Sequence, residues 1–518
     1  MRRWLFIVAF VAAICSRVGY TAPDVVRVEG GQISGTTADG VRVFKGVPFA
    51  AAPVGELRWK APQPVVPWSG VRAADTFGPQ CMQQPYPEGS PYASAPQPTS
   101  EDCLFLNVWT TASAGERRPV MVWIHGGAWT RGSGSTPTYD GAALAKRGVV
   151  VVTTNYRLGV FGFLAHPDLT AESPHHASGN YAILDHVAAL KWVHDNIPAF
   201  GGDPRNVTIF GESAGSWSVN VLHATPLAAG LFHRAIGESG GQFARTASLA
   251  DAEQGGVALL KAAGADSIKA LRATAAGKLL AIQSFRSVVT VDRYVLHDTV
   301  RETFAQKRHN RAPVLVGSNA NEWTTLSNPS QFPKTMDAYR QRVETQYGAM
   351  AKEYDAVYPV KRDADIAEAL LAVGRDTTFT LEMRTWARMV TAGGQRAFVY
   401  QFTHVPPGPR AKEWGAYHAA EISYVFGNLR NPTFAYTDVD RRLSDQMSTY
   451  WVNFAAAGDP NRGGNASKAP AGSIKWSPYD LASEAYLDLG DTLVMKNHLL
   501  KAQLDFLEQF QQRRQTSQ

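Results

Sequence analysis

The sequence has little cysteine, no block of one charge and no internal repeat. Only three cysteines occur among 518 residues, which leaves room for a single disulfide bond. Lys and Arg outnumber Asp and Glu by 51 to 45, and no basic run carries interleaved aromatic residues. This scatter of charge argues against a nucleic-acid-binding protein. Apolar content is ordinary and charge is moderate, so the composition indicates a globular chain rather than a disordered one.

An apolar run at the N-terminus is too short to span a bilayer. It covers eleven residues, Trp4 to Ile14, after two arginines, whereas a spanning helix needs about 20 residues. The pattern is typical of a secretory signal peptide. We expect residues 1–22 to be removed, with cleavage after Ala22 and cleavage after Ala13 as alternatives. The mature chain would then be exported to the periplasm or the medium of a bacterium, without stable membrane insertion.

One cysteine pair remains in the mature chain once Cys15 is removed with the leader. The remaining residues are Cys81 and Cys103. An even count in an exported protein predicts a disulfide bond between them. In the chain-entropy account, closing a loop of this length stabilises the fold by about 3 kcal/mol.

The middle of the chain alternates strand-like and helix-like segments. Residues 24–75 carry short alternating stretches that predict hairpin strands. From residue 105 onward, apolar runs bounded by Gly and Pro predict strands buried on both faces. Residues 330–395 have a mostly helical pattern. No low-complexity linker divides the chain, so we expect a signal peptide followed by one large α/β domain over residues 23–518.

A serine stands between two glycines in "FGESAGS", where an apolar strand pattern meets a helical one. Gly211, Ser213 and Gly215 form the G-x-S-x-G pattern, typical of the nucleophile turn of α/β-hydrolases. The chain must turn sharply there, so the flanking positions have no room for a side chain. The helix that follows points N–H groups at the site and favours developing negative charge. Ser213 is therefore the candidate nucleophile.

A second glycine-rich turn can supply hydrogen-bond donors to an oxyanion. The segment "WIHGGAW" follows an apolar strand some 85 residues before Ser213, where this kind of fold places its oxyanion loop. The candidate donors are the backbone N–H groups of Gly127, Ala128 and Ala214.

A serine nucleophile also needs a base and an acid that orients the base. In α/β-hydrolases the chain order is serine, acid, histidine. Glu322 follows a predicted strand in "APVLVGSNANEW", which leaves His404, His418 and His498 as candidate bases. The pattern favours His418, in a Gly-containing loop, and keeps His404, at a strand end, as its competitor.

Eight motifs in order make the chain similar to the type B carboxylesterase/lipase family, which includes cholinesterases and bacterial para-nitrobenzyl esterases. The resemblance runs from about residue 24 to residue 510. It implies an α/β-hydrolase fold: a central, mostly parallel sheet with helices on both faces, N-terminal antiparallel hairpins and helical insertions. The motifs are "GVPFAAAPVGELRWKAPQP", "SEDCLFLNVW", "VMVWIHGGAW", "NYRLGVFGFL", "FGGDPRNVTIFGESAGS", "LFHRAIGESGG", "GSNANEW" and "GAYHAAEISYVFG".

The resemblance also implies roles for particular residues. It places the base on His418 rather than His404. Two positions depart from the usual pattern: Asn321 and Trp323 flank the acid in place of an acidic residue and Gly, and Ala128 stands where many relatives have Gly. The implied set is the triad Ser213, Glu322 and His418, the oxyanion donors Gly127, Ala128 and Ala214, a supporting serine at Ser239, and the disulfide Cys81–Cys103.

The function implied is hydrolysis of small-molecule carboxylic esters without a metal or an organic cofactor. A lipase is an alternative, but the loop between the cysteines is rich in Pro, Ser and Gln rather than large aliphatic residues. A cholinesterase is disfavoured because its choline site uses a Trp in that loop, which here has only Tyr86 and Tyr92. A dedicated amidase and a non-catalytic binding module are further alternatives. The sequence carries no prediction of oligomeric state.

Overall fold

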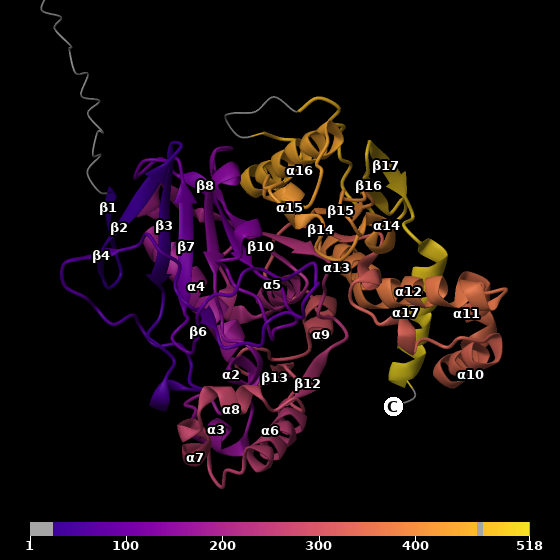
Figure 1. Cartoon of the computed structure of the whole chain (residues 1–518), viewed down its shortest axis with the longest axis horizontal. Helices are drawn as coiled ribbons and strands as arrows, with labels where there is room; N and C mark the ends of the chain where they lie inside the picture. Colours follow the sequence, from indigo (N-terminus) through magenta and orange to yellow (C-terminus); the bar gives the residue numbers. More distant parts are fainter. Residues whose placement is uncertain (1–23, 464–469, 517–518) are drawn as a thin grey trace, which may run out of the picture.

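The computed structural model of the chain describes residues 24–463 and 470–516 (Figure 1). The predicted signal peptide, residues 1–22, lies outside the described residues. Within the described ranges, no helix is both long and apolar enough to cross a membrane.

A large sheet of thirteen strands organises the described residues. Seven strands in its centre, from β9 to β16, run parallel to one another. The strands that precede them in the sheet form antiparallel pairs, as the N-terminal hairpin pattern predicts. The order across the sheet is β1 (Asp24–Val28), β2 (Gly31–Ala38), β3 (Val41–Pro48), β7 (Phe105–Thr110), β9 (Val150–Thr154), β8 (Arg118–Ile124), β10 (Gly202–Glu212), β11 (Arg234–Glu238), β14 (Val314–Asn319), β15 (Ala397–Phe402), β16 (Ala485–Leu489) and β17 (Leu493–Asn497), with β4 (Val71–Ala73) beside β2.

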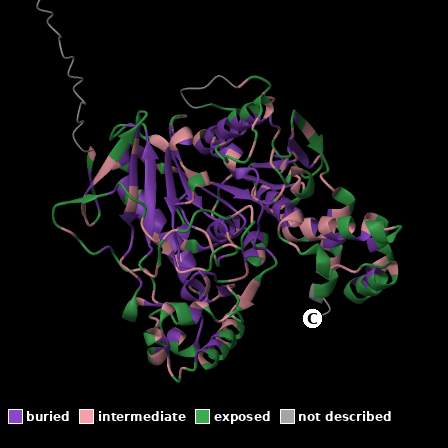
Figure 2. Ribbon diagram, viewed as in Figure 1, coloured by how far each residue is buried: buried purple, intermediate pink, exposed green. Residues whose placement is uncertain are grey.

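Helices cover both faces of this sheet, so its central strands are buried on both sides. Along β8, Val122 packs on the face shared with α4 (Tyr181–Asn196), α5 (Ala214–Ala224) and α13 (Leu381–Ala392). Trp123 packs on the opposite face with α15 (Ile422–Val425) and α16 (Asp438–Ala457). Successive side chains of a strand point to opposite faces, which explains why the sequence shows continuous apolar runs here. Figure 2 shows the buried residues concentrated in these layers. The α/β-hydrolase prediction is confirmed.

The remaining helices form two groups with their own small cores. One group lies at the side of the sheet, to the right in Figure 1. It confirms the helical pattern predicted for residues 330–395. It contains α10 (Met336–Tyr347), α11 (Ala351–Val357), α12 (Ile366–Arg375) and α17 (Lys501–Thr516). The second group contains α2 (Gly159–Phe163), α3 (Pro167–Glu172), α6 (Leu249–Ala263), α7 (Ile268–Ala273) and α8 (Ala276–Leu280). The short elements α1 (Ala142–Ala145), α9 (Val300–Ala305), α14 (Ala411–Trp414), β5 (Gln80–Cys81) with β6 (Thr99–Ser100), and β12 (Thr246–Ser248) with β13 (Val289–Val291) complete the described elements named here.

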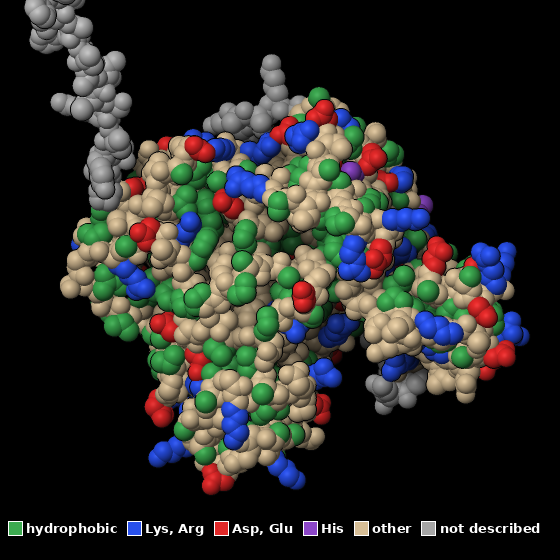
Figure 3. All heavy atoms as spheres, in the orientation of Figure 1, with side chains coloured by type: hydrophobic (Ala, Val, Ile, Leu, Met, Phe, Trp, Pro, Cys, Tyr) green, Lys and Arg blue, Asp and Glu red, His purple; other side chains and the backbone are tan. Residues whose placement is uncertain are grey.

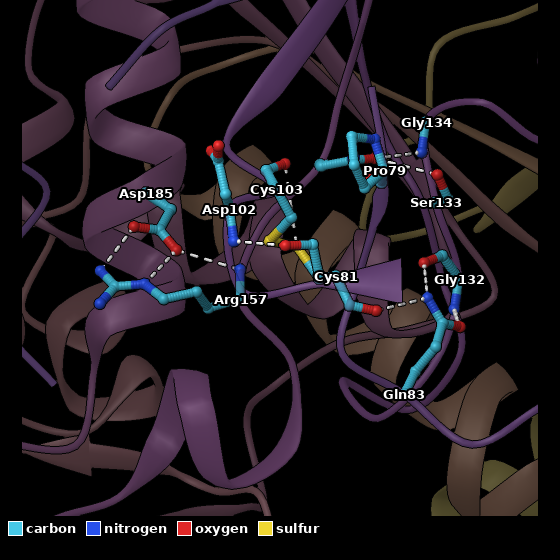
Figure 4. The surroundings of a disulfide bond; sticks show 12 residues. Pro79, Cys81, Gln83, Asp102, Cys103, Gly132, Ser133, Gly134, Arg157 and Asp185 are labelled. Atoms are coloured by element: carbon cyan, nitrogen blue, oxygen red, sulfur yellow. Dashed lines mark hydrogen bonds and ion pairs between the residues drawn. A yellow bond between two sulfur atoms is a disulfide. The ribbon is translucent and has the colours of Figure 1, made fainter. Parts of the chain in front are cut away.

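The predicted disulfide bond joins Cys81, at the end of β5, to Cys103, just before β7 (Figure 4). Beside it, Arg157 and Asp185 form a buried two-pronged ion pair, with N–O distances of 2.7 and 2.9 Å. Asp185 Oδ2 also accepts the backbone N–H of Arg157 at 3.0 Å. The paired geometry satisfies both charges inside the fold and ties the segment after β9 to α4. On the face of the molecule drawn in Figure 3, acidic and basic side chains are interspersed and form no large patch of one charge.

Candidate active site

Ser213 lies between β10 and α5 in a strained backbone conformation. Its φ is 55° and its ψ is −122°, a region that non-glycine residues rarely adopt. The glycines of the motif are required by contact: a Cβ on Gly215 would lie 2.0 Å from the backbone oxygen of Ile124, and one on Gly211 would lie 2.6 Å from it. The steric reason predicted for the glycines of this turn is therefore confirmed. Ser213 is 8% exposed.

The loop after β8 turns with three consecutive residues at positive φ. The values are 99° for Gly127, 55° for Ala128 and 57° for Trp129. This loop lies against the serine, because a Cβ on Gly126 would be 3.0 Å from Ser213 Cβ. The structure thus brings the predicted oxyanion loop next to the predicted nucleophile.

Buried side chains hold the oxyanion loop in place. Tyr156 Oη donates a hydrogen bond to the backbone oxygen of His125 at 2.8 Å, and the two rings stack with centroids 4.3 Å apart. Burial lowers the pKa of His125 to about 4, so this ring is neutral at physiological pH. Trp129 Nε1 donates to Ser218 Oγ on α5 at 2.9 Å. The loop is therefore held both by the segment that follows β9 and by the helix that follows Ser213.

The predicted base and acid lie in contact. His418 Nδ1 is 2.5 Å from Glu322 Oε2, and both side chains are buried. Glu322 follows β14 in a short 3-10 turn, and its other oxygen accepts the backbone N–H of Asn319 at 2.6 Å. Phe379, in a π-helical turn over Asp376–Thr380, packs its ring 4.7 Å from that of His418. The imidazole is thus oriented from two sides.

The unusual Asn321 beside the acid has a structural task. Its side-chain oxygen accepts the backbone N–H of Ala416 at 3.0 Å, and its own N–H donates to the backbone oxygen of Ala416 at 2.9 Å. These two bonds join the loop of Glu322 to the loop of His418. Asn321 therefore helps to fix the position of Glu322 relative to His418.

The other imidazole nitrogen faces the residue before the serine. His418 Nε2 lies 3.0 Å from Glu212 Oε1. Among the described residues, Ser213 Oγ makes no hydrogen bond. The structure therefore brings Glu322 and His418 into direct contact and places His418 beside the Glu212–Ser213 dipeptide.

Known proteins are similar to this chain over almost its whole length. A sequence model described as the carboxylesterase family matches residues 22–507. The chain belongs to the carboxylesterase family. A fumonisin B1 esterase of Sphingopyxis macrogoltabida is 39% identical over 85% of this chain and 83% of the relative, and a para-nitrobenzyl esterase of Bacillus subtilis is 34% identical over 92% and 96%.

Solved structures confirm the fold at similar identity. The carboxylesterase EST55 of Geobacillus stearothermophilus superposes with a TM-score of 0.81 at 34% identity, covering 93% of this chain and 99% of that one. A PNB esterase superposes with a TM-score of 0.79 at 33% identity, covering 94% and 100%. Together with the esterase relatives, these matches make the chain a carboxylic ester hydrolase.

His404, the competing candidate base, is occupied elsewhere in the enzyme. Its Nδ1 lies 2.6 Å from Asp491 Oδ1 and its Nε2 lies 2.9 Å from Asp440 Oδ1. Tyr424 Oη donates to the same oxygen of Asp440 at 2.6 Å. Because its two ring nitrogens contact carboxylates of α16 and of the turn between β16 and β17, His404 has the environment of a structural residue.

Three buried glutamates near the histidine escaped the sequence analysis. Glu212 and Glu421 are buried near the triad candidates, and Glu238 accepts Trp451 Nε1 at 2.7 Å. Ser239 Oγ donates to Glu421 Oε1 at 3.4 Å, which places the predicted supporting serine in this cluster. Their positions in the sequence could have identified them. Glu212 and Glu238 stand inside the "GES" motifs, and Glu421 follows His418 by three residues.

Burial sets the protonation of this glutamate cluster. It raises the pKa of Glu212 and of Glu238 well above the ordinary value, with neighbouring carboxylates adding to the effect. The pKa of Glu421 rises to about 7, first through burial and then through the charge of Glu322. The folded enzyme therefore holds protons on these groups that the unfolded chain releases.

Replacing Glu421 with glutamine is expected to flatten the pH dependence of stability. Because the folded pKa of about 7 exceeds the ordinary 4.5, the stabilisation from this group is complete below about pH 4.5 and is lost as pH rises through 7. An amide does not titrate. As the pH rises from 5 to 8, the unfolding free energy of Glu421→Gln should therefore fall by about 2–3 kcal/mol less than that of wild type. Urea unfolding at both pH values measures this, with the exposed Glu368→Gln as control. Equal pH dependence in wild type and Glu421→Gln would contradict the assignment.

In the ranges 24–463 and 470–516, no group of three or more His, Cys, Asp or Glu side chains is arranged to hold an ion.

Proposed function

We propose that this carboxylesterase is exported and hydrolyses small-molecule esters through an acyl-enzyme on Ser213. The observation that carries the proposal is the 2.5 Å contact between His418 Nδ1 and Glu322 Oε2, beside the strained turn that presents Ser213. The triad order and the flanking glycines are those of the nucleophile turn. The proposed triad is Ser213, Glu322 and His418.

In the proposed mechanism, His418 Nε2 accepts the proton of Ser213 Oγ as this oxygen attacks the ester carbonyl carbon. The carbonyl oxygen becomes an oxyanion held by the N–H groups of Gly127, Ala128 and Ala214. The imidazolium then protonates the departing alcohol. Water attacks the acyl-enzyme with His418 again as base, and the carboxylic acid is released.

The carboxyl groups around the imidazole have different tasks in this mechanism. Glu322 fixes the orientation of His418 and stabilises its positive charge. Glu212 lies 3.0 Å from Nε2, the nitrogen that must serve Ser213. Since burial raises the pKa of Glu212 well above its ordinary value, a neutral carboxyl occupies this position. A neutral carboxyl adds no second negative charge beside the imidazole, so Glu322 is the carboxylate that stabilises the imidazolium.

The purified enzyme should hydrolyse p-nitrophenyl esters of short acids faster than the laurate ester. The loop between Cys81 and Cys103 has few large aliphatic residues, unlike an apolar lipase lid. The assay compares kcat/KM from acetate to laurate and adds p-nitrobenzyl acetate and fumonisin B1, after the substrates named for two relatives. A preference for laurate would favour the lipase alternative, and faster amide than ester cleavage would favour the amidase. Absence of any turnover would favour a binding module.

Export is part of the proposal and rests on two observations. The N-terminal residues 1–22 have the charge and apolar pattern of a signal peptide, and Cys81 and Cys103 form a disulfide bond. Disulfide bonds persist in oxidising compartments such as the periplasm or the medium.

A further inference from the structure

The loop closed by the disulfide bond is fastened directly to the oxyanion loop. Gln83 makes two hydrogen bonds with the backbone of Gly132, donating to its oxygen and accepting from its nitrogen, each at 2.8 Å (Figure 4). Arg131 Nε donates to the backbone oxygen of Gln84 at 3.2 Å. With the Cys81–Cys103 bond at its base, this segment has a fixed position along residues 127–132.

This attachment carries the hydroxyl group of Tyr86 to the oxyanion loop. A Cβ built on Gly127, a proposed oxyanion donor, would lie 2.9 Å from Tyr86 Oη. A Cβ built on the preceding Gly126 would lie 2.8 Å from Glu212 Oε2 and 3.0 Å from Ser213 Cβ. The Tyr86 hydroxyl therefore lies against the turn at Gly127, and the Ser213 side chain lies against the same turn at Gly126.

The Tyr86 ring is held while its hydroxyl is left without a partner. The guanidinium of Arg131 lies 5.5 Å from the ring centroid, and the ring of Tyr92 lies 5.9 Å away. Tyr92 is itself tied down, since its hydroxyl is 2.6 Å from Thr325 Oγ1 and its ring packs 6.2 Å from that of His418. In the part of the chain that the structure describes, Tyr86 Oη makes no hydrogen bond, unlike the hydroxyl groups of Tyr92 and Tyr156.

The protonation of Tyr86 suits a donor. Burial raises its pKa to about 12. The hydroxyl therefore keeps its proton throughout the pH range in which a serine esterase works. Tyr86 is half-buried, and a protonated hydroxyl without a protein partner beside a charge-developing site can donate a hydrogen bond when substrate arrives.

We propose that Tyr86 Oη donates a hydrogen bond to the ester carbonyl oxygen as it becomes an oxyanion, next to the backbone donors. This inference rests on the proposed function, because it requires the carbonyl carbon to be attacked by Ser213. The hydroxyl contributes more as negative charge develops on the oxygen, so its effect falls on kcat more than on KM. The disulfide loop then supplies a catalytic residue, in addition to a wall of the site.

The test compares Tyr86→Phe, Tyr86→Ala and wild type in the full mature enzyme on p-nitrophenyl acetate. Tyr86→Phe keeps the ring contacts with Arg131 and Tyr92 and removes only the oxygen. We expect kcat to fall about 10- to 100-fold with KM changed less than about threefold. The affinity for an alkyl trifluoromethyl ketone, which forms a charged tetrahedral adduct with the serine, should fall by a similar factor. The matched control Tyr294→Phe removes a hydroxyl from a tyrosine stacked on His175 and should change neither quantity.

Two results would overturn the inference, and only the second would also overturn the proposed function. If Tyr86→Phe retains wild-type kcat and ketone affinity while Tyr86→Ala is impaired, the residue acts by packing alone. The proposed function then stands as long as Ser213→Ala is inactive. If Ser213→Ala turns over esters as fast as wild type, the proposed function and the role of Tyr86 fail together.

Discussion

Replacing Ser213 with alanine is expected to lower kcat for p-nitrophenyl acetate by about 10³-fold or more. The substitution removes the oxygen that forms the acyl-enzyme and leaves the backbone donors of the oxyanion loop in place. The residual rate then comes from substrate binding and from those donors alone. Because alanine is smaller than serine and the flanking glycines are unchanged, the turn between β10 and α5 should keep its fold.

The control for this prediction is Ser330→Ala, a substitution at an exposed serine in a short turn over Pro329–Gln331. It should retain wild-type kcat, and circular dichroism should show the same fold for wild type and both variants. If folded Ser213→Ala kept more than about a tenth of the wild-type rate, Ser213 would not be the nucleophile.

Replacing His418 with alanine is expected to cost about as much as losing the serine, because the members of a triad act as a unit. His404→Ala provides a matched comparison of two buried histidines, each in contact with carboxylates. We expect His404→Ala to lower the urea midpoint, since Asp440 loses one of its partners, while the folded fraction keeps a kcat within about threefold of wild type.

The histidine comparison uses kcat per folded enzyme, with the folded fraction measured by circular dichroism, so that loss of fold and loss of chemistry are separated. Equal and large losses of kcat in both folded variants would remove the distinction between a catalytic and a structural histidine. Retention of kcat in His418→Ala would contradict the proposed base directly.

Features that depend on local sequence could be predicted because each has a local physical cause. The turn at Ser213 follows from glycine spacing, because neighbouring backbone leaves no room for a Cβ at Gly211 or Gly215. Strands such as β8 and β9 follow from apolar runs of strand length. Glu322 could be proposed because it follows a strand at the end where such folds place their catalytic groups.

Features created by distant contacts could not be predicted from the pattern alone. The choice between His404 and His418 depends on the partners Asp440, Asp491 and Glu322, and a single sequence does not reveal these pairings. Tyr86 reaches Gly127 through the Gln83–Gly132 bonds, which join segments 49 residues apart. The glutamate cluster likewise gathers carboxyl groups from three separate segments.

The most direct test of the central claim is covalent labelling with a fluorophosphonate, whose phosphorus bonds to an activated serine oxygen as fluoride leaves. Intact-mass measurement and peptide mapping of wild type should find one label per chain, located on Ser213, with ester turnover lost in proportion to labelling. Ser213→Ala should take up no label. A label on another residue, or full labelling of wild type with turnover intact, would contradict an acyl-enzyme mechanism on Ser213.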